Sequence, residues 1–364
     1  MTVLDTPAAR RMRVKLADTL EAKGALSDPN LRRALEAVPR HLLVPGFWAG
    51  PGQLVGPDGP DYLARVYSDD VLATQITDGV VTSSSTAPGL MLAMLQALDV
   101  RPHHQVLEVA TATGYNAAIL CELVGADHVI TIEVDPGLAG DAERRLAEAG
   151  YRPRVVAKDG RSGFWDRAPY DRLIATCGFT TVPFAWVEQM RPGGVIVCPV
   201  GSGNVRLTVD DNSKRAEGRF LPEPSYFMSV REAGTTGTAD YPHAAEDEAV
   251  TRPTGLDPAA LFGKDGFPFL LSLLLPGVAL SSELDGTGAV TGCRIWTADG
   301  SWARVTEGTA HQAGPRNLWD RAEAAHQAWE EHDGPGRDRF GLTVTADGQA
   351  LWVDDPARVL TLAG

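Results

Sequence analysis

Three carboxylates lie at or next to the ends of apolar runs, each short enough to be one strand. Glu108 belongs to "HQVLEV", Glu133 belongs to "HVITIEVD", and Asp159 follows "RVVAK". The first run leads into "ATATGYN", a loop of small residues. Ligands of parallel sheets bind beyond the carboxyl ends of the strands. There Glu133 could bind the two hydroxyls of a ribose and Asp159 an adenine amino group, so we expect an adenosine-containing ligand.

The loop does not match the patterns that bind nucleotide phosphates. "ATATGY" lacks the GxGxxG pattern of dinucleotide sites, and the chain contains no GxxxxGK[ST] phosphate loop. A carboxylate directly before the loop would repel a phosphate and attract a cation. S-adenosylmethionine carries a sulfonium and an ammonium and therefore fits, although the acids could instead simply end their strands. The expected cofactor contacts are Glu108, Val109, Ala110, Thr111, Ala112, Gly114, Tyr115, Asn116, Glu133, Val134, Asp159 and Gly160.

A run of hydroxyl side chains precedes the apolar helix expected over residues 87–98. Backbone N–H groups at a helix N-terminus, together with hydroxyls, can hold an anion. At least one hydroxyl is expected to cap the helix, and in the alternative interpretation the whole run does only that. Arg65 and His41 could neutralise an anionic substrate or be ordinary surface residues. The candidate catalytic residues are Ser83, Ser84, Ser85 and Thr86.

Helices and strands alternate between about residues 85 and 210. Apolar runs of strand length are separated by helix-length segments, which predicts a doubly wound α/β fold with a parallel sheet. The run 205–209 is expected to be an added edge strand. The first forty residues predict two helices, the second capped by Asp28 with Pro29 in its first turn.

Composition divides the chain into four segments. "GCRIWTADGSWARV" and "FGLTVTADGQALWV" each predict a hairpin, with a helix between them. The tryptophans of this region are expected in a core or, alternatively, along a peptide-binding groove: Trp296, Trp302, Trp319, Trp329 and Trp352. The predicted segments are an N-terminal helical segment and loop (1–66), a cofactor-binding domain (67–211), a linker or long loop (212–256) and a C-terminal α+β domain that is a candidate for peptide recognition (257–364).

Charge and cysteine usage limit the function classes. The formal net charge of −14 argues against a general nucleic-acid binder. The four cysteines form no CxxC pair, so we expect no metal site and a reducing compartment. The longest apolar run, 269–280, is too short to span a bilayer and contains Pro276, so it is expected in a core. We therefore expect a cytoplasmic protein without nucleic-acid or membrane partners, and the oligomeric state stays open.

An ordered series of motifs occurs between about residues 40 and 210: "VPRHLLVP", "VVTSSSTAPGLMLAML", "VLEVATATGYNAAILCEL", "VITIEVD", "AKDGRSGF", "PYDRLIATC" and "VPFAWVEQMRPGGVIVCPVG". This series resembles the protein-L-isoaspartate O-methyltransferase family. The tail "GPRNLWDRAEAAHQAWEEHDGPGRDRFGLTVTADGQALWVDD" resembles the C-terminal extension of the peptide-modifying branch of that family. Members of that branch accompany lanthipeptides or graspetides, whereas the repair enzymes are shorter.

The resemblance implies a Rossmann-like S-adenosylmethionine-dependent methyltransferase domain with N-terminal helices and a smaller C-terminal α+β domain. It implies methyl transfer to a carboxylate, which is already ionised at neutral pH and needs no general base. In the peptide branch the acceptor is an aspartate of a modified precursor peptide, and the ester then closes to an aspartimide. Two alternatives stay open: a protein-L-isoaspartate repair methyltransferase, and a non-catalytic peptide-binding protein with a degenerate cofactor loop.

Two departures from the family pattern bear on this expectation. The family usually has "GTGTGY" where this chain has "ATATGY". We expect Ala110 to be tolerated if its φ is negative and a Cβ at Ala112 to crowd the methionine part of the ligand, with binding retained. The family's Thr-hydrophobe-Ser-Gln-Pro run is also altered. Aligned on Pro88, Thr86 takes the serine position and Ala87 the glutamine position, which favours a substrate other than free isoaspartyl residues.

Overall fold

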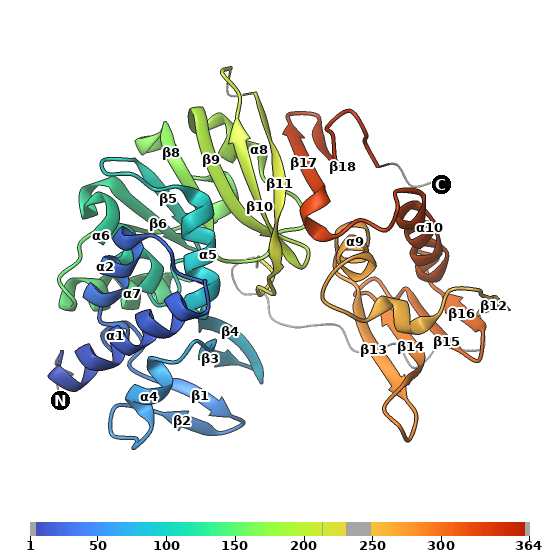
Figure 1. Cartoon of the computed structure of the whole chain (residues 1–364), viewed down its shortest axis with the longest axis horizontal. Coiled ribbons are helices and arrows are strands. Elements are labelled where there is room, and N and C mark those ends of the chain that lie inside the picture. The colour runs from blue at the N-terminus through green and yellow to red at the C-terminus, as the bar shows by residue number, and fades with distance from the viewer. Residues whose placement is uncertain (1–4, 213, 231–248, 361–364) are drawn as a thin grey trace.

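The computed structural model describes residues 5–212, 214–230 and 249–360. Within these ranges the strands form a nine-stranded sheet, a four-stranded sheet and a five-stranded sheet. In Figure 1 the large sheet runs across the upper half of the molecule, the four-stranded sheet lies at the lower left and the five-stranded sheet at the lower right. The chain thus joins one large sheet to two small ones.

The central strands of the large sheet are parallel and stand in the order β9-β8-β5-β6-β7. All of β5 and β6 is buried, as expected for apolar strands covered on both faces. This confirms the predicted doubly wound arrangement. The strands are β5 (Val106–Val109), β6 (Val129–Glu133), β7 (Arg154–Ala157), β8 (Tyr170–Ala175) and β9 (Met190–Val200).

The chain passes from β5 to β6 and β7 on one side, and then returns to β8 on the other side of β5. In such folds the crevice at the point where the strand order reverses is the usual ligand site. The connecting helices are α6 (Tyr115–Val124), α7 (Pro136–Glu148) and α8 (Phe184–Glu188). The topology therefore directs a ligand to the carboxyl end of β5.

Helices from the N-terminal part pack with α6 in one apolar cluster. The first two helices are as predicted: Asp28 accepts a hydrogen bond from the N–H of Asn30 at 2.7 Å, and Pro29 begins the second helix. Leu20, Leu35 and Leu98 are buried in the cluster. The helices are α1 (Pro7–Ala22), α2 (Pro29–Ala37), α3 (Arg40–Leu43), α4 (Tyr62–Val66) and α5 (Pro88–Leu98).

The four-stranded sheet crosses the predicted boundary at residue 66, because β1 pairs with β3 through Trp48 and Ala73. Its strand order is β2-β1-β3-β4. Part of the predicted Gly/Pro-rich loop is therefore strand and helix. The strands are β1 (Phe47–Gly50), β2 (Gln53–Val55), β3 (Leu72–Thr77) and β4 (Val80–Ser85).

Four antiparallel strands extend the central sheet beyond β9, in the order β10-β11-β17-β18. The predicted added strand at 205–209 forms as part of β10, but its placement at the edge was wrong, because β11 covers the far side of β10. Ala216 and Phe220 of β11 are buried in the core of the sheet, although this strand falls in the predicted linker. Local patterns cannot reveal such pairing over a long sequence distance. The strands are β10 (Gly203–Val209), β11 (Arg215–Pro224), β17 (Phe340–Thr345) and β18 (Gly348–Val353).

The predicted linker, 212–256, thus contains two strands, since β12 pairs with β16 in the small sheet. Residues 213 and 231–248 of that linker lie outside the described residues. The predicted hairpin at 340–353 forms, but it pairs with β11 of the large sheet instead of staying in the C-terminal segment. The four-segment division remains a prediction, and hydrogen bonding crosses its boundaries.

The small C-terminal sheet is antiparallel, in the order β12-β16-β15-β14-β13. Helices α9 and α10 cover it, and Leu318, Ala322 and Ala325 of α10 are fully buried. The apolar run 269–280 supplies most of α9 and the start of β13, and Phe269 to Leu271 are core. The elements are β12 (Val250–Pro253), α9 (Phe267–Leu274), β13 (Ala279–Leu284), β14 (Val290–Trp296), β15 (Trp302–Thr306), β16 (Thr309–Ala313) and α10 (Leu318–Glu331).

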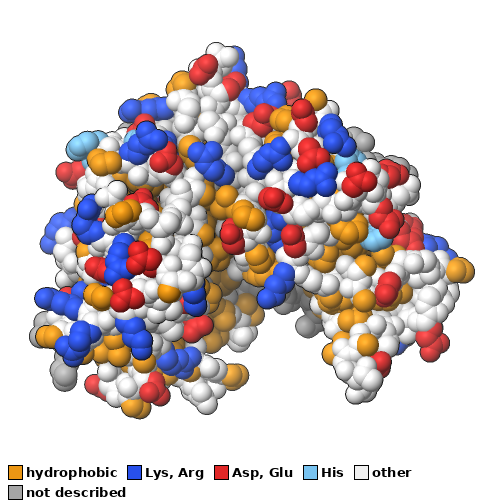
Figure 2. Space-filling model, in the orientation of Figure 1, with side chains coloured by type: hydrophobic (Ala, Val, Ile, Leu, Met, Phe, Trp, Pro, Cys, Tyr) orange, Lys and Arg blue, Asp and Glu red, His pale blue; other side chains and the backbone are white. Residues whose placement is uncertain are grey.

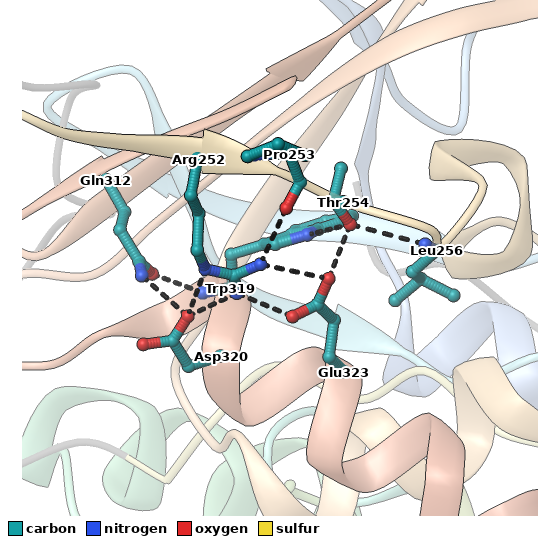
Figure 3. A network of polar contacts seen from close by, with 8 residues as sticks. All are labelled: Arg252, Pro253, Thr254, Leu256, Gln312, Trp319, Asp320 and Glu323. Carbon is teal, nitrogen blue, oxygen red and sulfur yellow. Dashed lines mark hydrogen bonds and ion pairs between the residues drawn. The ribbon is translucent and has the colours of Figure 1, made fainter. Parts of the chain in front are cut away.

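A polar network fastens β12 to α10 (Figure 3). Arg252 forms ion pairs with Asp320 and Glu323 of α10. The hydroxyl of Thr254 donates to Glu323 and accepts from the indole N–H of Trp319 at 2.8 Å. The chain after residue 248 is therefore fixed to the C-terminal helix from its first strand onward.

Helix α9 joins the C-terminal sheet to the large sheet. The ring of Phe269 packs edge-on against Phe220 of β11 and Phe340 of β17, with centroids 4.9 and 5.6 Å away. The guanidinium of Arg337 lies over the Phe269 ring, 4.1 Å from its centroid. Figure 2 shows hydrophobic side chains gathered in the middle of this face, with both signs of charge around them. The two parts are thus held by apolar packing and not by the connecting chain alone.

Candidate active site

A cavity of about 440 Å³ lies at the carboxyl ends of β5, β6 and β7. This volume is in the usual range for small-molecule sites. Of the predicted cofactor contacts it is lined by Val109, Ala110, Ala112, Glu133, Val134, Asp159 and Gly160. Of the predicted catalytic residues it is lined by Ser83, Ser84 and Thr86. The structure therefore brings the adenosine-type residues and the hydroxyl run together around one space.

The other predicted site residues do not line the main cavity. A neighbouring cavity of about 20 Å³, large enough for one water, is lined by Ser85, Glu108, Thr111, Tyr115 and Asn116. Gly114 lines neither cavity and has a φ of 84°, and a Cβ there would meet the side chain of Leu146 at 3.0 Å. These residues shape the cofactor loop from beneath it.

The cofactor loop uses a left-handed backbone at both of its alanines. The φ of Ala110 is 74° and that of Ala112 is 47°, so the condition under which Ala110 was expected to be tolerated, a negative φ, is not met. The N–H groups of Ala110 and Thr111 donate to the carbonyl oxygen of Ile132 at 2.8 and 3.1 Å, and the Ala112 N–H donates to Glu133 at 2.9 Å. These bonds from β6 hold two alanines in a conformation that favours glycine.

We expect Ala110→Gly and Ala112→Gly each to raise the free energy of unfolding by up to about 1 kcal/mol. A left-handed alanine costs about 1–2 kcal/mol, and the greater freedom of glycine in the unfolded chain offsets about 0.5–1 kcal/mol of that relief. Urea denaturation of each variant measures the change. Ala147→Gly, inside α7, is the control and should lower stability. A loss of stability in both loop variants would contradict this account of the loop.

Glu133 combines burial with access to the cavity. Its Oε2 accepts from the Ala112 N–H at 2.9 Å and its Oε1 from the Asp135 N–H at 3.3 Å. The side chain belongs to a residue that is only 5% exposed, and burial raises the pKa of its carboxyl although these backbone bonds oppose the shift. Each oxygen keeps a lone pair for a further donor, which suits the two hydroxyls of a ribose.

Asp159 and Gly160 form the end of the cavity beyond β7. Asp159 accepts from the Arg161 guanidinium at 2.7 Å, and this bond lowers the pKa of the carboxyl. A Cβ on Gly160 would lie 2.4 Å from Cγ1 of Val109, so only glycine fits between the two strand ends. The indole N–H of Trp186 donates to the Gly160 carbonyl at 2.8 Å and fixes this turn.

Glu108 does not face the main cavity, contrary to the expectation that it attracts the cationic end of the cofactor. It is fully buried and accepts from the Asn116 side chain at 2.7 Å and from the Thr131 hydroxyl at 2.6 Å. Burial raises the pKa of its carboxyl to about 7. Glu108 thus ties the start of α6 to β6 and positions the loop between them.

This carboxyl should make stability depend on pH. A group whose pKa is raised by folding stabilises the protein at low pH, and that contribution is lost as pH rises through the folded value. Between pH 5 and pH 8 we expect the free energy of unfolding to fall by roughly 3 kcal/mol more in the wild type than in Glu108→Gln. Urea denaturation across this range measures it. The exposed Glu143→Gln should keep the wild-type dependence, and equal slopes in all three proteins would contradict the prediction.

The hydroxyl run divides into two groups. Ser83 accepts from the Thr74 hydroxyl at 3.1 Å, and the Ser85 hydroxyl accepts from Arg40 at 3.1 Å. Within the described residues, the hydroxyls of Ser84 and Thr86 have no hydrogen-bond partner and line the cavity. These two are therefore best placed to meet a substrate.

None of the four hydroxyls caps α5, so that prediction was wrong. The cap residue is Ala87, and the side chain of Asp69 accepts from the Gly89 N–H at 2.7 Å instead. Asp69 comes from the turn before β3, which lies too far away in the sequence for a local capping pattern to reveal it. The hydroxyls remain available because a distant carboxylate does the capping.

Arg40 is a positioning residue that the sequence did not reveal. Its side chain is fully buried, and its guanidinium donates to backbone carbonyls of the turn before β3 and of the hydroxyl run: Val66, Ser68, Asp70, Ser85 and Thr86. It also lies over the ring of Tyr115, 5.3 Å from the centroid. One arginine thus holds the substrate loop against the cofactor loop. The available indication was its place, together with His41, in the mostly apolar run "VPRHLLVP".

Arg65 and His41, the two residues proposed from the sequence to neutralise an anionic substrate, lie in different places. His41 is 1% exposed and its ring lies 2.6 Å from the Tyr67 hydroxyl, so it supports the core and does not meet substrate. Arg65 lines the cavity from α4, with its guanidinium over the ring of Phe47 at 4.8 Å.

None of the five C-terminal tryptophans lines the cavity, and Trp302, Trp319 and Trp352 are core residues. Trp48 of β1 lines it instead.

Two further findings concern the described ranges as a whole. No helix among residues 5–212, 214–230 and 249–360 has the length and apolar character needed to cross a membrane. The same residues contain no cluster of three or more histidine, cysteine or acidic side chains arranged to hold a metal ion.

The cavity lies at the reversal point of a doubly wound sheet, where such folds bind their ligands, and Glu133 and Asp159 stand at its edge. The sequence profile of the protein-L-isoaspartate(D-aspartate) O-methyltransferases matches residues 11–228, and the chain belongs to this family. That match includes every predicted site residue. The C-terminal sheet and the β17–β18 hairpin lie beyond it.

Similar proteins carry the same name. The protein-L-isoaspartate O-methyltransferase of Methanopyrus kandleri is 37% identical over 205 residues, covering 56% of this chain and 82% of that protein. The one from Pyrobaculum arsenaticum is 33% identical over 215 residues, covering 58% of this chain and 96% of that protein. A solved protein-L-isoaspartate O-methyltransferase structure superposes with a TM-score of 0.56 at 19% identity, covering 94% of this chain and 100% of its own. The last likeness concerns the fold.

The protein is therefore an S-adenosylmethionine-dependent carboxyl O-methyltransferase. The residues present suit this cofactor, because carboxylates that can accept hydroxyl and amino protons stand where an adenosine would lie. When bound, S-adenosylmethionine supplies an electrophilic methyl group. Glu133 and Asp159 would hold its adenosine end, and the loop of Ala110 and Ala112 would lie beside its methionine end. Which residues make these contacts remains a prediction.

Proposed function

We propose that the enzyme methylates the side-chain carboxylate of an aspartate in a ribosomally made, post-translationally modified peptide, a lanthipeptide or a graspetide. The observation that carries a carboxylate acceptor is the pair of unpartnered hydroxyls, Ser84 and Thr86, in the same cavity as Arg65. The tail 314–355, which resembles the extension of the peptide-modifying branch, and the altered substrate loop support a modified peptide over a free isoaspartyl residue.

The methyl transfer requires the protein mainly to position the carboxylate and the methyl donor. A side-chain carboxylate has an ordinary pKa near 4 and reaches the site ionised. One of its oxygens would form the new bond to the methyl carbon as the bond from that carbon to sulfur breaks, with S-adenosylhomocysteine as the leaving group, and no residue of the chain would need to transfer a proton. The hydroxyls of Ser84 and Thr86 would orient the carboxylate by donating to it. The four-stranded sheet supplies one wall of the cavity and would shield the reacting atoms from water on that side.

The proposed product then rearranges. A backbone nitrogen next to the methylated aspartate attacks the ester carbonyl, methanol leaves, and a five-membered aspartimide forms. Methoxide is a better leaving group than the oxide of a free carboxylate, so esterification makes this step feasible. The closure needs no residue of this chain.

A second candidate is repair of isoaspartyl residues in proteins. It is favoured by the names of the similar proteins and by the family match, which includes the whole cavity. The alternative of a non-catalytic peptide binder, which Ala110 and Ala112 in the cofactor loop suggested, does not agree with the family match. The two enzymatic candidates differ in the carboxylate that they methylate, an aspartate of a modified peptide or an isoaspartyl residue of a protein.

The test begins with calorimetric titration of the protein with S-adenosylhomocysteine. Binding followed by methyl transfer to an aspartate of a constrained lanthipeptide or graspetide, with aspartimide seen by mass spectrometry, supports the proposal. Transfer only to a linear isoaspartyl peptide establishes the repair function instead. Absence of binding at millimolar ligand, with or without peptide, contradicts both candidates.

A further inference from the structure

A second cavity, of about 310 Å³ and here called the loop cavity, lies next to the active-site cavity. Ser83, Ala112 and Leu138 line both spaces and therefore form the wall between them. The other walls of the loop cavity come from the end of α3, the four-stranded sheet and α7. Neither the carboxylates expected to hold the adenosine nor the two hydroxyls best placed for the acceptor line it. Its volume suits a small molecule, and the methyl transfer does not use it.

Arg145 of α7 brings a buried, unsatisfied donor to the loop cavity. One end of its guanidinium pairs with Asp141, with Nη2 3.1 Å from Oδ2, and the side chain is only 16% exposed. Its Nε is buried and has no hydrogen-bond partner within the described residues. A buried N–H group without an acceptor is destabilising, and native proteins seldom leave one so. The position of Arg145 therefore indicates an acceptor that the described chain does not supply.

The other polar groups of the loop cavity also favour an anion. Gln75 accepts from the Thr82 hydroxyl through Oε1 at 2.7 Å, which leaves its NH₂ group as a donor. Thr113 accepts from a backbone N–H at 3.4 Å, and its hydroxyl proton remains to be donated. Asp141 is the one carboxylate in the lining, and it already pairs with two arginines. Available donors therefore outnumber available acceptors.

The rest of the lining is largely apolar. Leu43, Pro45 and Leu138 contribute hydrocarbon surface, and Leu54 of β2, which is 62% exposed, stands at the side open to solvent. An inorganic anion would leave this surface in contact with water. An organic anion with a short alkyl chain would cover it and gain the free energy of apolar burial.

We propose that the loop cavity binds a small organic carboxylate with a short alkyl chain. The carboxylate would accept from Nε of Arg145 and from the NH₂ group of Gln75, and the chain would pack against Leu43 and Leu54. This site is separate from the place of the acceptor carboxylate. The inference is therefore independent of which carboxylate the enzyme methylates.

A ligand in the loop cavity would also touch the cofactor loop from the side opposite the cofactor. Ala112 lines both cavities, and its N–H donates to Glu133, the residue expected to bind the ribose, at 2.9 Å. Holding Ala112 in place would hold this bond as well. We expect the two ligands to strengthen each other's binding, because coupling between two sites is reciprocal.

Fluorine NMR of trifluorobutyrate tests the binding directly. The wild type should broaden the probe signal at millimolar concentrations, and Arg145→Met should abolish this broadening. Arg144→Met is the matched control, since Arg144 is the next residue, is 56% exposed and pairs with the same Asp141. Arg65→Met should also keep the broadening, because Arg65 lines the active-site cavity and not the loop cavity. The neutral trifluorobutyramide should bind about tenfold more weakly.

Calorimetric titration with S-adenosylhomocysteine, in butyrate or in chloride of equal concentration, tests the coupling. Butyrate should tighten binding about fivefold in the wild type and in Arg144→Met, and should have no effect in Arg145→Met. A loop cavity that holds only water gives no broadening in the wild type, which overturns the inference. Broadening that survives Arg145→Met, or equal binding of the amide, overturns the carboxylate site. Each of these outcomes leaves the proposed methyl transfer standing.

Discussion

Replacing Arg40 by methionine will lower the free energy of unfolding by at least about 3 kcal/mol. The guanidinium is fully buried and donates to carbonyls on two segments, the turn that ends at Asp70 and the loop of Ser85 and Thr86. Methionine fills much of the volume but leaves several buried acceptors without donors, at about 1–3 kcal/mol each. The substrate loop then loses its anchor, so we also expect the residual enzyme to have a reduced kcat.

Urea denaturation and steady-state kinetics measure the two effects of this change. Arg40→Lys keeps the charge but has a single nitrogen that cannot reach both segments, so it should fall between the wild type and Arg40→Met. Arg33→Met, on the exposed face of α2, is the control and should alter stability by less than about 0.5 kcal/mol. If Arg40→Met were as stable as Arg33→Met, the guanidinium would not be holding the loop.

Replacing Glu133 by glutamine will weaken the binding of S-adenosylhomocysteine about 100-fold. A carboxylate can accept from two ribose hydroxyls while it also accepts from the Ala112 and Asp135 N–H groups. Glutamine has one acceptor oxygen and one NH₂ group, which cannot accept from a backbone N–H. Hydrogen bonds to a charged acceptor contribute about 1.5–3 kcal/mol each, which gives the expected factor.

Isothermal titration calorimetry tests this prediction, with thermal unfolding of the free protein as a check on folding. Glu148→Gln is the control, since Glu148 lies at the solvent-exposed end of α7 and, among the described residues, forms an ion pair with Arg144 alone. It should bind with wild-type affinity. A change of less than threefold in Glu133→Gln would remove Glu133 from the cofactor site and leave the cavity without its main ribose ligand.

Periodicity revealed the parallel core but not the strands that extend it. The runs ending near Glu108 and Glu133 are apolar over their whole length, which is the pattern of strands covered on both faces, and the structure has them so. By contrast, β11 carries buried Ala216 and Phe220 among charged residues. Its sequence alone therefore predicts an exposed segment and not a strand of the core. Pairing between distant segments depends on the whole fold, and local pattern carries little of it.

The site shows the same division. Glu133, Asp159 and the hydroxyl run could be placed from their positions after strands and before a helix. The left-handed φ of Ala110 could not, because its residue type argues against that conformation and only the bonds from β6 impose it. Nor could the burial of Arg40, whose role depends on carbonyls from a segment some thirty residues away. The sequence predicted the site residues whose place follows from the adjacent strand or helix. It did not predict conformation or burial that depends on distant segments.

The β17–β18 hairpin closes the central sheet from the far end of the chain, which gives the order of synthesis a consequence for folding. When β11 leaves the ribosome, its partner strand is still more than a hundred residues from being made. At ordinary translation speeds the wait is on the order of 10 s. During that interval the nascent enzyme presents an unpaired strand edge beside an already formed cofactor cavity. A cell making this protein must protect that edge from neighbouring nascent chains, and the last hairpin ends the hazard when it emerges.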